Sequence, residues 1–464
     1  MKKVVVLALL FCPFLIFAQD ITGKWYGKLS VMGSELLFGF DFSKNDTSYS
    51  GKMDIPQQNA KGIPLLSVTF EDKTLVFKFD QAKFSYTGKL NASNEFEGVF
   101  SQNGQNFPLN LTRTETTLKK INRPQEPKPP FDYNIEEVTF INEKDNITLG
   151  GTFTAPKSEN FPIAILISGS GQQDRNSEIF GHKPFWVIAD YLTKNGIGVL
   201  RIDDRGVGKS GGNPATSTTY DFATDIEAAV QYIKTKRGVN PKKIGLIGHS
   251  EGGMIAPIVA SKNKNISFIV LLAAPGIPCD ELLMEQTFLI AKVTGASDAE
   301  IAESQKTNRM IYDLVKSDKS NNEIKSDLAN VFKTQFNNDP SFNNLSESEK
   351  NQMINQQIQS VSSSWIRSFL GFKPEEYLKK VKCPVLVLNG EKDLQVPPQS
   401  NLDGIKKAFI KGGNKKITIK EYPNLNHLFQ ECTTGSTEEY GEIEQTFSPQ
   451  VLSDIKDWIL DQAK

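Results

Sequence analysis

The chain has 464 residues, which is too long for a single hydrophobic core and predicts two or three domains. Its 53 basic and 54 acidic residues give a formal net charge of −1, which excludes the positive surface expected of a nucleic-acid-binding protein. The four cysteines are too few for a small scaffold held together by disulfides.

The chain begins with the pattern of a secretory signal peptide. Lys2 and Lys3 precede an apolar run over residues 4–17, and the small residue Ala18 precedes the expected cleavage site. This run is short for a membrane span, which needs about 20 apolar residues. We therefore expect removal of residues 1–18, no stable membrane insertion, and export to the periplasm or the medium.

Three cysteines would remain after this cleavage, at positions 279, 383 and 432. At most one disulfide can form among three thiols. No C-x-x-C pair and no adjacent histidine accompanies them, so buried structural thiols are favoured over reactive or metal-binding ones.

Residues 19–115 have the pattern of an antiparallel β domain. Short runs alternate apolar and polar residues, and Gly, Asn and Asp separate them. No helical stretch interrupts this pattern, which predicts a sandwich or a small barrel. Aromatic residues such as Trp25 and Tyr26 would suit carbohydrate binding if they were exposed, but aromatic residues in short strands are more often core. A structural role is therefore favoured. The clearest runs are residues 36–42, 66–70, 74–79, 96–100 and 107–111.

Residues 116–133 are rich in proline and charge and predict an extended linker. Strands and helices then alternate through residues 134–464. This alternation implies crossover helices and a mostly parallel sheet covered on both faces, with the ligand crevice at the carboxyl ends of the strands. Strands are expected at 137–141, 147–153, 162–167, 198–202, 267–272, 383–388 and 416–422, and helices at 185–192, 222–233, 402–409 and 451–459.

The alternation stops between about residues 278 and 378. Apolar residues recur there at helical spacing in three stretches, 282–293, 310–315 and 354–361, with segments rich in Asn and Ser between them. We predict a helical cap inserted into the α/β domain that restricts what enters the active site. The alternative is a decoration that faces outward and takes no part in binding.

The segment Gly248-His249-Ser250-Glu251-Gly252 has the pattern Gly-x-Ser-x-Gly. It follows an apolar strand and opens an apolar helix, so Ser250 is predicted at a sharp turn between the two. Glycine is expected at positions 248 and 252 because side chains there would collide in so tight a turn. The helix N-terminus presents N–H groups and a positive dipole end to an oxyanion that forms beside the serine.

A serine hydroxyl needs a general base, and the base needs a carboxylate to orient it. The chain has three histidines, and only His427 lies in the loop after the last predicted strand. His182 precedes an early helix, and His249 is expected to point away from the crevice. His427 is therefore the predicted base.

The predicted carboxylate is Asp393, in the turn after the strand at 383–388, and Glu391 in the same turn competes with it. The chain order Ser250, Asp393, His427 is the order of nucleophile, acid and histidine in one hydrolase fold.

The oxyanion needs backbone N–H donors. One is expected from Glu251, and the other from Ser170 or Gln172 in the glycine-rich loop 168–175. That loop lacks the Gly-Lys-Ser/Thr of a phosphate-binding loop.

A second glycine-rich stretch carries Asp204 and Arg205, which we expect to brace the loops through buried charge-assisted hydrogen bonds. There is no H-E-x-x-H pattern, and three scattered histidines make no zinc cluster, so no metal or other cofactor is expected.

Residues from about 135 to 464 resemble the α/β-hydrolase superfamily, specifically exported bacterial esterases and hydrolases of the serine aminopeptidase-like branch. The N-terminal β domain also resembles domains attached to such hydrolases. Many relatives have His-Gly at the oxyanion loop, where this chain has Ser168-Gly169. The resemblance implies that Ser250 attacks a carbonyl group, that His427 transfers the proton and that Asp393 orients the imidazole. The motifs that carry it are SGSGQQDRN (168–176), RIDDRGVGKSGG (201–212), GHSEGG (248–253), NGEKDLQVP (389–397) and NLNHLF (424–429).

The expected reaction is hydrolysis of a small carboxylic ester, such as an acylated carbohydrate, through an acyl-enzyme. The alternative is a serine exopeptidase acting on short peptides, in which Glu251 or Glu281 would hold the substrate's free amino group. Related oligopeptidases tend to have an aromatic residue at the position of Glu251, which favours the esterase. A third hypothesis is a carbohydrate-binding protein without catalysis. The complete set of serine, histidine and aspartate argues against it, because a protein without catalysis would be free to lose His427.

Overall fold

The computed structural model describes residues 20–31, 34–46, 48–56, 60–79, 84–102, 105–115, 122–338, 342 and 346–464. Contacts divide the chain into two compact units, one up to residue 119 and one from residue 120. The predicted signal peptide, residues 1–18, lies outside the described residues, so cleavage and export stay predictions. No helix in the described part of the chain has both the length and the apolar character that a membrane span requires.

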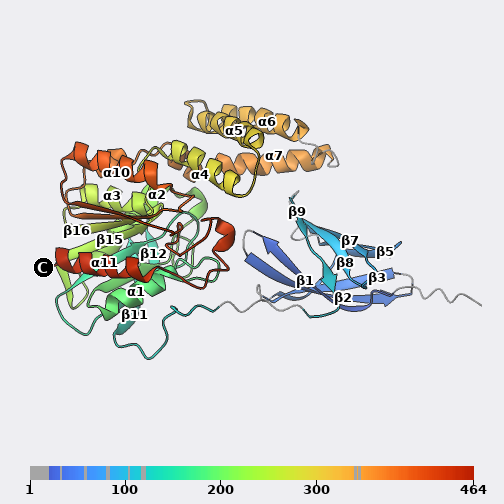
Figure 1. Ribbon diagram of the computed structural model, residues 1–464, viewed down its shortest axis with the longest axis horizontal. Helices are drawn as coiled ribbons and strands as arrows, with labels where there is room; N and C mark the ends of the chain where they lie inside the picture. Colours follow the sequence, from blue (N-terminus) through green and yellow to red (C-terminus); the bar gives the residue numbers. More distant parts are fainter. Residues whose placement is uncertain are drawn as a thin grey trace, which may run out of the picture. The chain divides into compact units, whose positions relative to one another are not determined.

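The N-terminal unit is an antiparallel β barrel (Figure 1). The ring closes because the short last strand, β10, pairs with both β1 and β8. Of the two folds that the sequence allows, the structure therefore has the barrel. Its strands are β1 (Gly23–Val31), β2 (Ser34–Asn45), β3 (Ser48–Ile55), β4 (Ala60–Pro64), β5 (Ser67–Glu71), β6 (Thr74–Phe79), β7 (Phe84–Leu90), β8 (Phe96–Gln102), β9 (Gln105–Pro108) and β10 (Leu111–Thr112).

Aromatic side chains form much of the barrel's core. Trp25 is only 1% exposed. Its ring lies 4.7 Å from the ring of Phe96, and the guanidinium of Arg113 lies 3.9 Å from the ring centre. Trp25 is therefore a core residue and not an exposed carbohydrate platform, which agrees with the structural role favoured for this domain. The buried aromatic residues are Trp25, Phe38, Phe40, Phe42, Phe77, Phe79, Phe84, Tyr86, Phe96 and Phe100.

The second unit contains an eight-stranded sheet in the order β11-β12-β14-β13-β15-β16-β17-β18. The pairs β11–β12 and β12–β14 are antiparallel, and all the others are parallel. The strands are β11 (Asn134–Asn142), β12 (Ile147–Ala155), β13 (Phe161–Ile167), β14 (Gly198–Ile202), β15 (Val239–His249), β16 (Ile266–Leu272), β17 (Val385–Gly390) and β18 (Ile417–Tyr422).

Helices cover both faces of this sheet (Figure 1). Two helices pack on one face, α1 (Pro184–Lys194) and α11 (Pro449–Gln462). Three pack on the other, α2 (Thr219–Ile233), α3 (Gly252–Lys262) and α10 (Pro398–Gly412). Each face buries its own apolar cluster, so the central strands β13, β14 and β17 are buried on both sides, as expected for a parallel sheet. The predicted α/β-hydrolase fold with a separate all-β domain is confirmed.

A set of helices lies between β16 and β17, where the sequence predicts the cap. Figure 1 shows α5, α6 and α7 packed beside one another, away from the sheet, with α4 between them and the sheet. The helices are α4 (Cys279–Val293), α5 (Asp298–Lys316), α6 (Asn321–Asn338), α7 (Glu347–Val361), α8 (Ser364–Leu370) and α9 (Glu375–Leu378).

Helix α6 was not predicted from the sequence, which indicated a polar segment rich in Asn and Ser at this place. Its apolar residues recur only every four positions, and most of the residues between them are polar, so the stripe is narrow. These four side chains nevertheless form the centre of the cap's own core. They are Ile324, Leu328, Phe332 and Phe336.

The described part of the predicted linker, residues 122–133, belongs to the α/β unit. The guanidinium of Arg123 donates hydrogen bonds to the backbone carbonyls of Phe180 (3.0 Å), Gly441 (2.8 Å) and Ile443 (2.5 Å). The amide of Gln125 donates to the carbonyl of Phe447 at 2.7 Å. Residues 123 and 125 of this segment therefore hold the loop 440–447, which follows the predicted catalytic histidine in the chain.

His182 holds the same loop from the inside. Its Nε2 lies 2.9 Å from the carbonyl oxygen of Tyr440 and 2.9 Å from the amide nitrogen of Gln430, and its Nδ1 lies 2.9 Å from the hydroxyl oxygen of Thr446. Burial lowers the pKa of His182 to about 4, so the ring is neutral at physiological pH. His182 has a structural role.

The cysteines at 279, 383 and 432 are free thiols in the structure. Cys279 is fully buried, and burial raises the pKa of its thiol. Cys383 and Cys432 are only partly buried, so the predicted burial is confirmed for Cys279 alone.

Candidate active site

Ser250 lies at the predicted turn between β15 and α3. Its φ of +54° is in the left-handed region, which few residues other than glycine adopt. The backbone is fixed on both sides of this strained residue, because the N–H of Ser250 donates to the carbonyl of Leu272 (2.9 Å) and the N–H of Gly253 donates to the carbonyl of Ser250 (2.8 Å). The turn therefore holds Ser250 at the carboxyl end of the central strands.

The two glycines of the motif are required by close backbone contacts. A Cβ atom on Gly248 would lie 2.1 Å from the carbonyl oxygen of Gly252. A Cβ atom on Gly252 would lie 2.2 Å from the carbonyl oxygen of Ile167 at the end of β13. The predicted collisions are therefore real, and the second one is with the neighbouring strand.

His427 and Asp393 are brought together by the loops after β18 and β17. The Nδ1–H of His427 donates to Oδ2 of Asp393 at 2.8 Å. The other carboxylate oxygen, Oδ1, accepts the backbone N–H groups of Gln395 (2.9 Å) and Val396 (2.8 Å). Asp393 is 1% exposed. This arrangement fixes the carboxylate and leaves Nε2 as the basic nitrogen of the imidazole.

Glu391, the competing carboxylate, has a different position. It is exposed, and its Oε2 accepts the backbone N–H of Asn424 at 2.9 Å. The acidic partner of His427 in the structure is therefore Asp393.

His249 joins Ser250 to the His427 loop, a contact that the sequence did not predict. The Nε2–H of His249 donates to the backbone carbonyl of His427 at 2.9 Å, and the two rings lie 4.7 Å apart. Burial and the neighbouring His427 lower the pKa of His249 to about 3, so its ring is neutral. The residue next to Ser250 therefore touches the histidine that is predicted to activate it.

The glycine-rich loop 168–175 lies against Ser250. A Cβ atom on Gly169 would be 3.2 Å from the Cβ of Ser250. Both Ser170 and Gln172 are exposed on this loop. The choice between their N–H groups as the second oxyanion donor stays a prediction, as does the N–H of Glu251 as the first.

Asp204 holds the two ends of this loop. One of its oxygens accepts the hydroxyl of Ser168 at 2.6 Å, and the other accepts the N–H of Gln173 at 2.9 Å. Burial raises the pKa of Asp204 to about 7, and its hydrogen bonds with Ser168 and Gln173 oppose that shift. Asp204 and Glu251 line the same small cavity, of about 30 Å³, so each carboxylate also disfavours the charge on the other.

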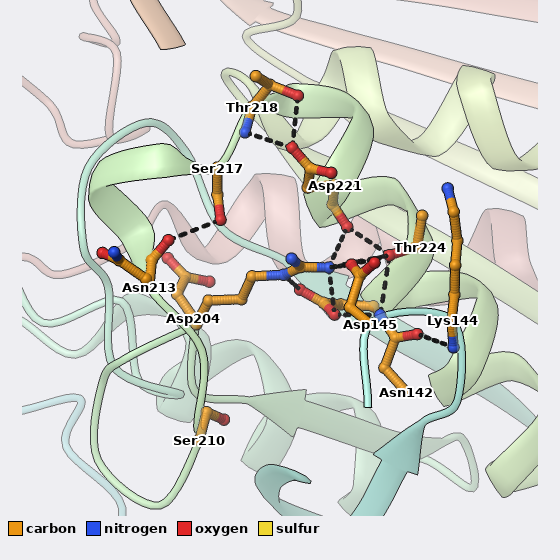
Figure 2. Close-up of polar contacts among 12 residues, drawn as sticks. Asn142, Lys144, Asp145, Asp204, Ser210, Asn213, Ser217, Thr218, Asp221 and Thr224 are labelled. Atoms are coloured by element: carbon orange, nitrogen blue, oxygen red, sulfur yellow. Dashed lines mark hydrogen bonds and ion pairs between the residues drawn. The ribbon is translucent and has the colours of Figure 1, made fainter. Parts of the chain in front are cut away.

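Arg205 anchors the stretch that carries Asp204, and Figure 2 labels two of its partners, Asp145 and Thr224. Its Nε–H donates to Asp225 at 2.6 Å, and its Nη2 donates to the hydroxyl of Thr224 at 2.9 Å and to Asp145. These contacts are charge-assisted and largely buried. The bracing role predicted for Asp204 and Arg205 is therefore confirmed.

A further ion pair in this region was not predicted. The guanidinium of Arg175, at the end of the glycine-rich loop, contacts both carboxylate oxygens of Asp203, at 2.9 Å from Nε and 2.6 Å from Nη2. A buried bidentate pair of this kind fixes the loop in orientation as well as position. The sequence contained a signal for this pair, because Arg175 and Asp203 are oppositely charged residues in the two glycine-rich motifs.

Glu251 is the second feature that sequence reasoning missed. Its carboxylate is 2% exposed and accepts the hydroxyl of Thr219 (2.6 Å) and the indole N–H of Trp365 (2.9 Å to Oε1). A charged residue between Ser250 and Gly252, at the start of an apolar helix, was a signal that could have indicated a buried and paired carboxylate.

The ionisation of Asp204 gives a prediction for stability. Between about pH 4 and pH 7 the unfolded chain loses the Asp204 proton while the folded protein keeps it, so this group lowers the free energy of unfolding as pH rises. The Asp204→Asn variant cannot ionise and lacks this decline. The quantity to follow is the free energy of unfolding of wild type minus that of the variant, measured with urea. We expect this difference to be about 2 kcal/mol lower at pH 7.5 than at pH 5.

The figure of about 2 kcal/mol allows for screening by solvent, because Asp204 is only partly buried as a residue. The Ser261→Ala variant, in α3, is the control, because it neither adds nor removes an ionisable side chain, and its stability difference from wild type is expected to stay constant with pH. A gap for Asp204→Asn that is equal at both pH values would contradict a raised pKa.

No group of three or more His, Cys, Asp or Glu side chains in the described ranges is arranged to hold a metal ion. The structure brings the paired imidazole and carboxylate of His427 and Asp393 to the loop that His249, the neighbour of Ser250, contacts.

Comparison with known proteins places the chain in a family. The family described as "Serine aminopeptidase, S33" matches residues 185–431, just over half of the chain. Esterase EstD of Thermotoga maritima is 26% identical over 240 residues, which cover 51% of this chain and 52% of EstD. The monoglyceride lipase homolog of monkeypox virus is 23% identical over 309 residues, which cover 66% of this chain and 93% of that protein.

The first of these curated relatives is matched over about half of its length. Among solved structures, the Pyrococcus furiosus esterase Pf2001 aligns with a TM-score of 0.41 at 17% identity, over 75% of this chain and all of that chain. Est1E from Butyrivibrio proteoclasticus aligns with a TM-score of 0.40 at 17% identity, over 70% of this chain and 98% of that chain. The match to the family covers α1 through the His427 loop, including β15, Ser250 and Asp393. The chain belongs to the serine aminopeptidase S33 family of the α/β-hydrolase superfamily.

Proposed function

We propose that this protein hydrolyses small carboxylic esters through an acyl-enzyme formed on Ser250. The observation that carries the proposal is the pairing of His427 with Asp393 beside the strained turn that presents Ser250. Membership of a hydrolase family and the likeness to Esterase EstD support it.

In the proposed reaction, Nε2 of His427 takes the proton of the Ser250 hydroxyl as Oγ attacks the ester carbonyl. The tetrahedral oxyanion is stabilised by the N–H of Glu251 and by one N–H of the loop 168–175. His427 then gives the proton to the departing alcohol, and the acyl group stays on Ser250. Water, deprotonated by the same imidazole, releases the acid and restores the serine.

Asp393 keeps the imidazole in the tautomer that this reaction needs. Its Oδ1 is held by two backbone N–H groups, so Oδ2 is directed at Nδ1 of His427 and keeps the proton there. The same carboxylate stabilises the imidazolium that forms during each proton transfer.

The burial of Glu251 favours an esterase over an exopeptidase. An exopeptidase needs a carboxylate that is free to bind the substrate's amino group. The Glu251 carboxylate is enclosed and already accepts hydrogen bonds from Thr219 and Trp365. Glu281, the other predicted candidate, is exposed in the first turn of α4. The Glu251 carboxylate is therefore already paired, and we propose ester cleavage. We also propose that the protein is exported, as the signal-peptide pattern of residues 1–18 predicts.

The test uses the purified chain from residue 19 onward with three substrates: p-nitrophenyl butyrate, alanine p-nitroanilide and N-acetylalanine p-nitroanilide. We expect kcat/KM for the ester to exceed that for either anilide by at least about a hundredfold, and no preference between the two anilides. The two anilides differ only in the free amino group, so they isolate recognition of that group.

A strong preference for the anilide with the free amino group would move the assignment to an exopeptidase. No serine-dependent turnover of any of the three substrates would contradict the proposal for small esters.

A further inference from the structure

Glu251 connects the turn at Ser250 to the cap. The residue follows Ser250 directly, and its carboxylate accepts the indole N–H of Trp365, at 2.9 Å to Oε1 and 3.2 Å to Oε2. Trp365 is the second residue of cap helix α8. The hydroxyl of Thr219, the first residue of α2, donates to the same carboxylate at 2.6 Å. Three elements that are distant in the sequence therefore meet at one buried carboxylate.

This contact is the type that resists displacement. A carboxylate that leaves water loses free energy unless donors replace its hydration, and the N–H and O–H donors here are charge-assisted. Burial raises the pKa of Glu251, and the hydrogen bonds from Thr219 and Trp365 lower it again, so both donors favour the charged form. Loss of one donor leaves the carboxylate underpaired, and it must move or take up a proton.

Any such movement acts on the proposed oxyanion donor. The N–H of Glu251 belongs to the peptide bond that joins it to Ser250, so a shift of the Glu251 side chain pulls on the same Cα atom. The backbone at Glu251 has φ of −57° and ψ of −33°, and its carbonyl accepts the N–H groups of Met254 (2.8 Å) and Ile255 (3.1 Å). Both the backbone carbonyl and the side-chain carboxylate of Glu251 are therefore held by hydrogen bonds.

Helix α8 connects this point to the rest of the cap. It packs against the cap helices α4, α5 and α7 and also against α2 of the α/β domain. The Trp365 ring is itself held by the ring of Phe369, at 5.0 Å between centres. A movement of the cap helices would therefore move the indole N–H of Trp365 as well.

We propose that Trp365 is a positioning residue that acts through Glu251: its indole N–H holds the Glu251 carboxylate so that the backbone N–H beside Ser250 points at the oxyanion. The inference rests on the proposed function of Ser250. It makes the cap part of the catalytic arrangement, because the chemical step is fastest only when α8 is seated.

The central test variant is Trp365→Phe, which keeps an aromatic ring against Phe369 and removes the N–H. We expect kcat for p-nitrophenyl butyrate to fall about tenfold while KM changes by less than twofold, because misaligning an oxyanion donor weakens binding of the transition state and not of the substrate. Thr219→Val, which removes the other donor at nearly constant shape, is expected to change kcat in the same direction.

A double-mutant cycle distinguishes action through Glu251 from a separate effect of the indole. In the Glu251→Met background, which has no side-chain oxygen to accept the indole N–H, Trp365→Phe is expected to reduce kcat by less than twofold further, because the hydrogen bond it removes is already absent. Glu285→Gln is the matched control. Its carboxylate, on cap helix α4, accepts the hydroxyl of Ser400 on α10 at 2.5 Å, so it also joins the cap to the α/β domain, but away from Ser250. This control is expected to keep the wild-type kcat.

Three results would overturn the inference: a Trp365→Phe variant with wild-type kcat, a change confined to KM, or effects of Trp365→Phe and Glu251→Met that simply multiply. Thr219→Val supplies the same comparison if Trp365→Phe does not fold. Ser250→Ala is measured alongside. If that variant keeps the wild-type rate, the proposed function fails, whereas its inactivity combined with a fully active Trp365→Phe variant overturns only the role of Trp365.

Discussion

Ser250→Ala is expected to lower kcat/KM for p-nitrophenyl butyrate by roughly 10⁴-fold or more, because the variant lacks the atom that becomes acylated. The remaining rate comes from the oxyanion donors and from substrate binding. Alanine meets the same backbone strain at φ of +54° as serine does, so we expect little change in stability. Initial rates at saturating and subsaturating ester concentrations give kcat and KM separately.

Ser261→Ala is the matched control for this variant. Ser261 is near the end of α3, the helix that begins just after Ser250, and its hydroxyl donates to the carbonyl of Ile258 at 2.8 Å. We expect Ser261→Ala to hydrolyse the ester at the wild-type rate. A Ser250→Ala variant within tenfold of wild type would mean that another group performs the reaction.

Asp393→Asn is expected to lower kcat by about 10³- to 10⁴-fold, with KM nearly unchanged. The geometry predicts how the amide will sit. Two backbone N–H groups, from Gln395 and Val396, contact Oδ1, so the oxygen of asparagine takes that position. Its NH₂ group then faces Nδ1 of His427, which forces that nitrogen to accept and moves the ring proton to Nε2. The imidazole is left in the tautomer that cannot take a proton from Ser250.

Glu391→Gln, in the same turn, is the control for this second variant. Its side chain is exposed and accepts the N–H of Asn424 at 2.9 Å. We expect its kcat to stay within about threefold of wild type. Equal losses in both variants would indicate a general disturbance of the turn, and an Asp393→Asn variant with wild-type kcat would exclude Asp393 as the partner of His427.

The parts of the fold that could be predicted are those in which one short stretch contains the whole signal. Apolar runs such as residues 162–167 and 198–202 predicted the buried strands β13 and β14 almost to the residue. The turn at Ser250 was predictable because Gly248 and Gly252 show where the backbone is crowded. Local sequence is enough where local sterics decide the conformation.

Other features depend on contacts between distant residues. The barrel and the sandwich differ by the pairing of a two-residue strand, β10, with both β1 and β8, which no local pattern reveals. The apolar residues of α6 become recognisable as core only when α5 and α7 are placed beside them. Propensity and period are weak guides where tertiary packing selects the structure.

The candidate site shows the same division. Residue type and chain order pointed to Asp393 and His427, and the structure brings these two side chains together. The contact of Glu251 with Trp365 joins residues 114 positions apart, and nothing in either segment indicates its partner. The sequence could show that a buried glutamate needs a donor, but only the fold identifies which residue supplies it.

The central claim, that Ser250 is the nucleophile of an acyl-enzyme, is tested most directly by covalent trapping. Diethyl p-nitrophenyl phosphate transfers its diethylphosphoryl group to an activated serine oxygen and releases p-nitrophenolate, and the product is too stable for water to clear quickly. Intact-mass and peptide mass spectrometry of the treated protein then locate the group. We predict one diethylphosphoryl group per chain, on the peptide that contains Ser250, complete loss of ester hydrolysis, and no labelling of Ser250→Ala. An active protein that is labelled at another residue, or that keeps its ester hydrolysis with Ser250 fully labelled, would contradict the account.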